Sequence, residues 1–185
     1  MAEQKVTTKR WFKVYAPSYL NTVHIGDVLG KQKKDIHKKK ITMNLGDVTN
    51  DARRQKTSVT FQVVSVDGNE AHSRVTNVAM TRTAVKRSVR KGRTKITDRH
   101  EIKTSDDNTM TVKPFIITNS RVKNSAATAV RKKAKKMLEN VGSDNSAEDI
   151  YQMLLNGTLQ RQMKEELADI TPIRFADLKE SKLHV

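Results

Sequence analysis

Apolar and polar residues alternate along the first two thirds of the chain. The segments 41–45 (ITMNL) and 59–63 (VTFQV) show the pattern most clearly. A period of two is typical of strands that bury one face, and here it extends from about Lys9 to Thr118. The first part of the chain is therefore predicted to form mainly antiparallel strands.

Two hairpins are expected within this part. Thr57–Val66 is followed by Asp67-Gly68, a pair favoured in type I′ turns, and then by Ser73–Val78 as the returning strand. The second hairpin joins Lys95–Thr104 to Thr109–Thr118 across Ser105–Asn108. Pro114 cannot donate a hydrogen bond, so its strand is expected to lie at an edge or to contain a bulge.

Helical periodicity replaces alternation in four places. A short basic helix is predicted from Met80 to a stop at Gly92, and an amphipathic helix from Ser125 to Val141, ended by Gly142. Ser146 with Asp149 resembles a capping box before a third helix. The fourth helix carries apolar residues at spacing four, namely Leu159, Met163 and Leu167.

The last alternation, in 173–175 (IRF), follows Pro172 and predicts that the chain returns to the sheet. The expected fold is α+β, with a mainly antiparallel β core and peripheral basic and amphipathic helices. We predict one domain over residues 1–185, with a β-rich part at 9–118, a helical part at 125–168 and a closing strand at about 170–178.

The charged residues indicate that this domain binds another molecule. The chain has 36 lysines and arginines against 20 acidic residues, a formal net charge of +16. Residues 1–143 hold 31 basic and 12 acidic side chains, whereas residues 144–185 hold 5 and 8. Such self-repulsion favours a polyanionic partner. A nucleic acid is preferred over an anionic membrane surface, because binding a membrane needs a basic amphipathic helix with large apolar residues on its other face, and Trp11 is the only tryptophan.

Cysteine is absent, and no apolar run approaches the ~20 residues that a membrane-spanning helix needs. The sequence also has no apolar signal segment at its start. These observations favour a cytoplasmic protein without a membrane partner.

Three clusters of cations lack balancing acids and are the candidate RNA-binding surface. The strongest lies on and just before the predicted 125–141 helix, where residues 131, 132, 135 and 136 project away from the apolar stripe. In the second, Arg82, Lys86, Arg90 and Arg93 fall on one side of the predicted basic helix. The third lacks apolar periodicity and predicts a mobile loop or strand extension that orders on RNA. The candidate residues are Arg121, Lys123, Arg131, Lys132, Lys133, Lys135 and Lys136; Arg82, Lys86, Arg87, Arg90, Lys91 and Arg93; and Lys31, Lys33, Lys34, Lys38, Lys39 and Lys40.

A single basic run is more often a solvated surface than a binding site. Three such runs favour binding, because solubility alone would be served by interspersed acids. Aromatic residues are only 4% of the chain, and those near its start, Trp11, Phe12, Tyr15 and Tyr19, are mostly interpreted as packing residues. Sequence-specific reading of bases is therefore not predicted.

No motif of an enzyme is present. The five histidines are far apart, and the seven glycines form neither a phosphate-binding loop nor a nucleophile elbow. No cofactor, metal or catalytic residue is predicted. Two alternatives stay open: a metal-dependent nuclease with scattered carboxylates, which would degrade RNA only with Mg²⁺ or Mn²⁺, and a basic protein that prefers duplex DNA.

Five parts of the sequence together are distinctive: 11–18 (WFKVYAPS) with Ile25-Gly26, 80–82 (MTR), 103–106 (KTSD), 124–139 and 170–175 (ITPIRF). They resemble the archaeal and eukaryotic S3Ae family of small-subunit ribosomal proteins, and the resemblance implies a β-barrel-like core with peripheral helices. One departure is Asp107-Asn108, because members of the family commonly have glycine after the aspartate near position 106, so the turn type is left open.

The resemblance implies a non-enzymatic, structural constituent of the small ribosomal subunit. It further implies a place on the platform near the messenger exit region, in contact with small-subunit ribosomal RNA and neighbouring ribosomal proteins, and it makes messenger RNA a further candidate partner. The longer terminal extensions of eukaryotic relatives are absent, which favours an archaeal source. The acidic last quarter is then expected to face a protein neighbour or solvent, or merely to cover the sheet.

Overall fold

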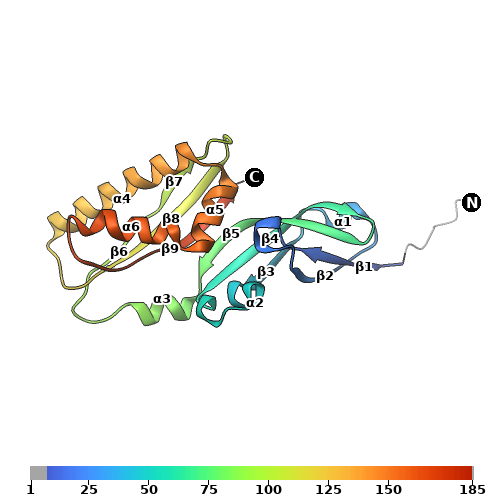
Figure 1. Ribbon diagram of the computed structural model, residues 1–185, viewed down its shortest axis with the longest axis horizontal. Helices are drawn as coiled ribbons and strands as arrows, with labels where there is room; N and C mark the ends of the chain where they lie inside the picture. The colour runs from blue at the N-terminus through green and yellow to red at the C-terminus, as the bar shows by residue number, and fades with distance from the viewer. Residues whose placement is uncertain (1–7, 185) are drawn as a thin grey trace, which may run out of the picture. The chain divides into compact units, whose positions relative to one another are not determined.

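The computed structural model describes residues 8–184, which form six α-helices, nine strands and two short 3-10 turns (Figure 1). Contacts divide the chain into two compact units. The first contains the residues up to Gln55 together with Val59–Thr76, and the second contains Lys56–Ser58 and the residues from Asn77 onward. The ends of the predicted 1–185 domain lie outside the described residues, and the single-domain boundary stays a prediction.

The first unit is built on five strands in the order β2-β1-β5-β4-β3. Strand β1 pairs with β2 antiparallel and with β5 parallel, and β4 pairs with both β3 and β5. The elements that begin in this unit or lie in it are β1 (Arg10–Tyr15), β2 (His24–Gly30), α1 (Lys33–Ile36), β3 (Lys40–Asn44), α2 (Leu45–Thr49), β4 (Thr57–Asp67) and β5 (Glu70–Met80), with 3-10 turns at Ser18–Leu20 and Ala52–Arg54.

The predicted alternation places the core of this unit. Val59, Phe61 and Val63 of β4 are buried, and so are Phe12 and Val14 of β1. The hairpin of β4 and β5 is confirmed, but its turn is not the predicted type I′. That type needs positive φ at both central residues, whereas in this turn only Gly68 has one, at 59°.

The second unit contains the end of β5 and the strands β6 (Lys95–Thr97), β7 (His100–Lys103), β8 (Thr109–Thr118) and β9 (Ile173–His184). Strand β8 pairs antiparallel with β9 along its whole length and with β6 and β7 on its other side. The second predicted hairpin is therefore present, with its first strand interrupted between β6 and β7. Asp107 in its turn has φ 56°, a left-handed conformation that glycine adopts easily and aspartate tolerates.

Strand β8 is central, so Pro114 does not lie at an edge. The pairing of β8 with β9 shifts register between Lys113 and Pro114, which is the bulge alternative of the prediction. The residue left out at this bulge is Lys179 of β9, because Lys113 pairs with Glu180 and Pro114 with Leu178. On the other side of β8, Pro114 lies between the residues paired with β7 and those paired with β6, a gap in the ladder where proline is tolerated. The mainly antiparallel α+β fold is confirmed. The nine strands stay unclosed among the described residues, so the likeness to a barrel is loose.

The basic helix after β5 is shorter than predicted. Helix α3 spans Arg82–Ser88, and Thr81 caps it by accepting a hydrogen bond from the Ala84 N–H. Val89 already has an extended backbone, so the helix ends before Gly92. Ala84 and Val85 pack on a cluster formed by Met80, Phe115 and Ile117 with Phe175. This apolar contact is what positions the basic side chains of α3.

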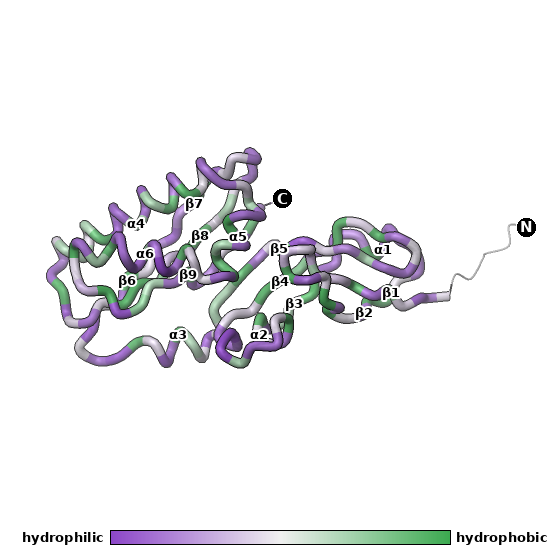
Figure 2. Tube along the Cα trace, in the orientation of Figure 1, coloured by the Kyte–Doolittle hydropathy of each residue, from purple (hydrophilic) through white to green (hydrophobic). Residues whose placement is uncertain are grey.

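Three longer helices pack in the second unit: α4 (Asn124–Asp144), α5 (Ala147–Asn156) and α6 (Thr158–Ala168) (Figure 1). Their apolar stripes are buried as predicted, with Val130, Ile150 and Met163 at most 1% exposed. Figure 2 shows how hydrophilic and hydrophobic residues alternate along α4. The capping box of α5 is confirmed, since Ser146 accepts from the Asp149 N–H and Asp149 accepts from the Ser146 N–H.

Gly142 does not end α4, contrary to the sequence prediction, because the helix continues to Asp144. It marks a close approach to β7 instead. A Cβ at this position would lie 2.7 Å from the carbonyl oxygen of Lys103 and 3.3 Å from the Cβ of Ile102. Only a residue without a side chain lets the helix lie this close to the strand.

Gly142→Ala is expected to lower the free energy of unfolding by about 1–2 kcal/mol, because the overpacking cost exceeds the better helix propensity of alanine. Chemical denaturation with urea would measure the difference. Ser143→Ala, at the exposed neighbouring position, is the matched control and is expected to change stability by less than about 0.5 kcal/mol. A Gly142→Ala variant as stable as the parent would contradict the close packing.

Candidate nucleic-acid interface

The strongest basic cluster lies on and just before α4. Arg121, Lys123, Arg131, Lys132, Lys135 and Lys136 are exposed, and Lys133 is partly buried. The apolar stripe of α4 packs inward, as the burial of Val130, Ala134 and Met137 shows. Since charged and apolar residues occupy different sides of one helix, the cluster is presented to solvent.

Three of these cations are already compensated within the protein. Arg131 pairs with Asp98 at 3.2 Å, and Lys135 pairs with Glu139 one helical turn away at 3.6 Å. Lys133 pairs with Asp169 at 2.6 Å and donates to the Glu166 carbonyl at 2.5 Å, which ties α4 to the end of α6. The remaining cations, Arg121, Lys123, Lys132 and Lys136, form no ion pair with any acid in residues 8–184.

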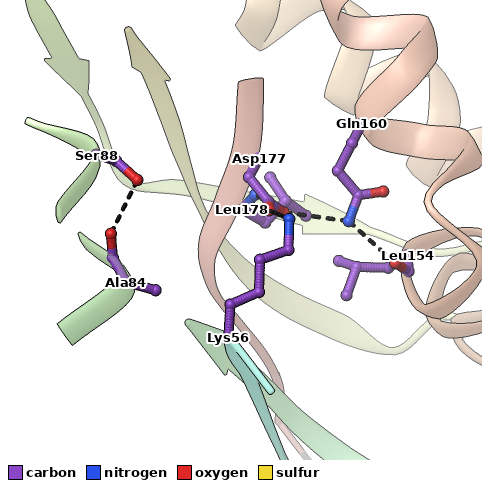
Figure 3. A network of polar contacts seen from close by, with 7 residues as sticks. All are labelled: Lys56, Ala84, Ser88, Leu154, Gln160, Asp177 and Leu178. Atoms are coloured by element: carbon purple, nitrogen blue, oxygen red, sulfur yellow. Dashed lines mark hydrogen bonds and ion pairs between the residues drawn. The ribbon is translucent and has the colours of Figure 1, made fainter. Parts of the chain in front are cut away.

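The second cluster is not a helical face. The sequence spacing placed Arg82, Lys86, Arg90 and Arg93 on one side of a helix, but α3 ends at Ser88. The Ser88 hydroxyl donates to the Ala84 carbonyl at 2.8 Å within the last turn (Figure 3). Beyond Val89 the chain turns at Lys91-Gly92, so Arg90 and Arg93 are directed by this turn and not by the helix.

This segment contributes to a pocket of about 610 Å³ in the second unit. Cations line it from three parts of the chain: the end of α3 with the segment after it, α6, and the start of β9. We call it the basic pocket, and its cations are Arg87, Arg90, Arg93, Lys164 and Arg174. None of the five takes part in an ion pair with a described acidic residue.

A polar network is centred on the buried carboxylate of Asp177 (Figure 3). The Asp177 carboxylate, 6% exposed, pairs with Lys56 at 3.3 Å and accepts from the Gln160 amide at 3.1 Å and from the Leu178 N–H at 2.8 Å. The Lys56 ammonium also lies 5.3 Å from the centre of the Phe175 ring. This network holds the start of β9 against α6, the two elements that supply Arg174 and Lys164 to the pocket.

The third cluster belongs to the first unit and forms the predicted strand extension only at its end, where Lys38 and Lys39 exchange backbone hydrogen bonds with Val63 of β4 and Lys40 begins β3. Lys33–Ile36 form the single-turn helix α1, which Gln32 and Asp35 cap reciprocally. Ile36 is fully buried and lies against Gly30, where a Cβ would approach to 2.6 Å. This one apolar anchor is too short to show as periodicity, which is why the sequence pattern missed it. The lysines of the cluster are all exposed.

Trp11 is the exception among the aromatic residues near the start of the chain. Phe12 is buried, and Tyr15 and Tyr19 are partly buried, as packing residues should be. Trp11 on β1 is 64% exposed because its neighbours in the strand alternate inward.

Within the described residues, no group of three or more histidine and acidic side chains could hold a metal ion. No helix in that part of the chain has the length and hydropathy needed to cross a membrane.

Comparison with known proteins decides the family. A model of the ribosomal S3Ae family matches residues 1–184, nearly the whole chain. The chain belongs to the ribosomal S3Ae family. The resemblance inferred from the sequence is thereby confirmed, and the protein is a structural component of the ribosome rather than an enzyme.

Relatives of this S3Ae protein are archaeal proteins named small ribosomal subunit protein eS1. That of Nanoarchaeum equitans is 28% identical over 172 residues, which cover 93% of this chain and 87% of the relative. That of Pyrobaculum arsenaticum is 30% identical over 174 residues, or 92% and 79% of the two chains. That of Haloarcula marismortui is 25% identical over 187 residues, or 99% and 88%.

Sequence reasoning missed two members of the basic pocket in this S3Ae protein, Lys164 and Arg174. Both lie in the last quarter of the chain, where the net charge is negative and the few cations form no cluster along the sequence. A usable signal existed for Arg174, since the alternation in 173–175 places it opposite the buried Ile173. No comparable signal pointed to Lys164, because its proximity to α3 depends on how α6 packs.

Proposed function

We propose that this S3Ae protein binds small-subunit ribosomal RNA by neutralising and positioning its phosphates, without catalysis. The supporting observation is that the candidate cations have few partners of their own. Of the residues predicted to bind RNA, only Arg131, Lys133 and Lys135 pair with a described acid. Desolvated phosphates would supply the missing counter-charges and release bound ions, so binding should weaken steeply with salt.

The proposed place of the protein is the platform of the small subunit, near the messenger exit region. The likeness to eS1 proteins of the small subunit supports assignment to that subunit, and the platform follows from the family resemblance. Neighbouring ribosomal proteins are proposed partners, and messenger RNA is a further one. Helices α5 and α6 of the acidic last quarter bury their apolar stripes, so their exposed polar residues are what a protein neighbour would contact.

Sedimentation of the endogenous protein through sucrose gradients tests the proposal. At low salt nearly all of the protein should migrate with small subunits, and a free fraction should grow as salt is raised. A large free pool at both salts would contradict a ribosomal role. Purified protein should then be compared on small-subunit ribosomal RNA and on duplex DNA, where preference for the duplex DNA would favour the DNA-binding alternative.

A further inference from the structure

We propose that the basic pocket binds one unpaired nucleotide of a single-stranded RNA segment. The phosphates would lie on the pocket cations and the base against Phe175. This inference rests on the proposed RNA-binding function and adds the conformation of RNA that one site selects.

Charge is the first argument. Five cations surround one hollow, and the acidic residues of α6, β9 and the neighbouring segments compensate none of them. Arginine guanidinium groups bind phosphate through paired hydrogen bonds, and four of the five cations are arginines. By contrast, Lys133 of α4 has its own carboxylate in Asp169. An anionic ligand is therefore expected at the pocket.

Size and shape are the second argument. A volume of about 610 Å³ falls in the range of sites for small ligands and admits one nucleotide. A double helix presents its phosphates in rows on a convex surface and keeps its bases stacked inside. Such a surface can lie across basic helices, but it cannot send a nucleotide into a hollow. A single strand can turn one nucleotide out of its stack.

The apolar part of the lining is the third argument. Phe175 lies among the cations and adds apolar surface to the pocket, whereas Ile173 is 5% exposed and supports it from beneath. Phe175 is partly exposed, and its ring is held edge-on to Phe115, with centres 6.0 Å apart. Proteins that bind single strands combine cations for the backbone with aromatic side chains for the bases. A site for phosphate alone would need no such surface.

Fluorescence anisotropy with a short labelled single-stranded RNA of mixed sequence, and with its blunt duplex, tests the inference. The variant Lys164→Gln/Arg174→Gln should bind the single strand about tenfold more weakly and lower the salt slope by about 1.4, since each lost contact to a single strand accounts for about 0.7. Its affinity for the duplex should change less than about twofold, because a duplex cannot enter the pocket.

The matched control is Lys179→Gln/Lys182→Gln, which removes the same charge from exposed positions of β9 outside the pocket. It should weaken both RNAs slightly and equally. Equal losses in the pocket variant and the control, or a pocket variant that weakens duplex as much as single strand, would overturn the inference. Thermal unfolding of each variant would establish that the fold is intact.

Two further measurements address the nucleotide itself. Phe175→Leu keeps an apolar side chain but removes the aromatic ring, and should weaken single-strand binding by about fivefold or more if a base stacks there. Unchanged affinity would overturn the assignment of a base. Adenosine monophosphate should displace the labelled strand only at high concentration, and tight displacement would overturn RNA as the ligand in favour of a free nucleotide.

The outcomes for the pocket and for the proposed function can be told apart. If ribosomal RNA binds the parent protein with a steep salt dependence and binds the pocket variant with the same affinity, only the further inference fails. If the parent protein binds no RNA and sediments free of the small subunit, the proposed function fails first.

Discussion

Charge reversal at Lys132 and Lys136 together is expected to weaken the binding of small-subunit ribosomal RNA by about 100-fold near 0.1 M salt, and to lower the salt slope by about 2. Both side chains are exposed on the solvent side of α4 and form no ion pair with a described acid. Lys133 is left unchanged because reversal there would set two negative charges beside each other at Asp169 and loosen α4 from α6.

A filter-binding titration of the RNA at several salt concentrations measures both quantities. The double variant Lys179→Glu/Lys182→Glu makes the same change in net charge on β9 and serves as the control. If both double variants weaken binding equally, the effect is one of overall charge and α4 has no special role. Unchanged affinity and slope in the Lys132/Lys136 variant would remove α4 from the interface.

Asp177→Ala is expected to lower the free energy of unfolding by about 3 kcal/mol, the largest stability effect of a single change proposed for this protein. The substitution leaves the buried Leu178 N–H and one of the two Gln160 amide hydrogens without an acceptor, while the Gln160 amide keeps its bond to the Leu154 carbonyl. It also removes the ion pair with Lys56. This ion pair contributes less to stability than the buried hydrogen bonds, because the Lys56 side chain is 48% exposed. Asp177→Asn keeps one acceptor oxygen and should cost about half as much.

Urea denaturation of the purified variants would measure these differences. Glu180→Ala is the matched control, because Glu180 lies on the same strand and pairs with Lys113 but is about a third exposed. Its loss should cost less than about 1 kcal/mol. An Asp177→Ala variant no less stable than the Glu180→Ala variant would contradict the burial of the network. Since the network holds β9 against α6, single-strand RNA binding should also weaken in Asp177→Ala.

Local pattern was most reliable where one physical rule acted alone. The capping box at Ser146 and the stripes of α4 and α6 follow from hydrogen bonding and burial within a few turns of one helix, so they were predictable. Failures occurred where a distant segment decided the outcome. A glycine at position 142 is typical of the end of a helix. Here it is needed for another reason, because the Lys103 carbonyl lies too close to leave room for a side chain.

The candidate site shows the same division. The α4 cations could be found from sequence because one helix presents them together. The second cluster could not, because the helical spacing of Arg82, Lys86, Arg90 and Arg93 ceases to matter once α3 ends at Ser88. Whether the predicted residues contact RNA stays a prediction for the experiments above.

The sequence by itself determined the fold class, the positions of most strands and helices, the excess of positive charge and the family. These properties depend on hydrophobic period, on capping and turn residues, and on the number of ionised groups, all of which can be read along the chain. Only the tertiary structure decided which cations already have partners and which converge. Lys164 and Arg174 lie beside Arg90 and Arg93 because α6 packs, and β9 pairs with β8, in a way that brings them to the same pocket. Side chains that meet through pairing between distant segments cannot be recognised from their spacing along the sequence.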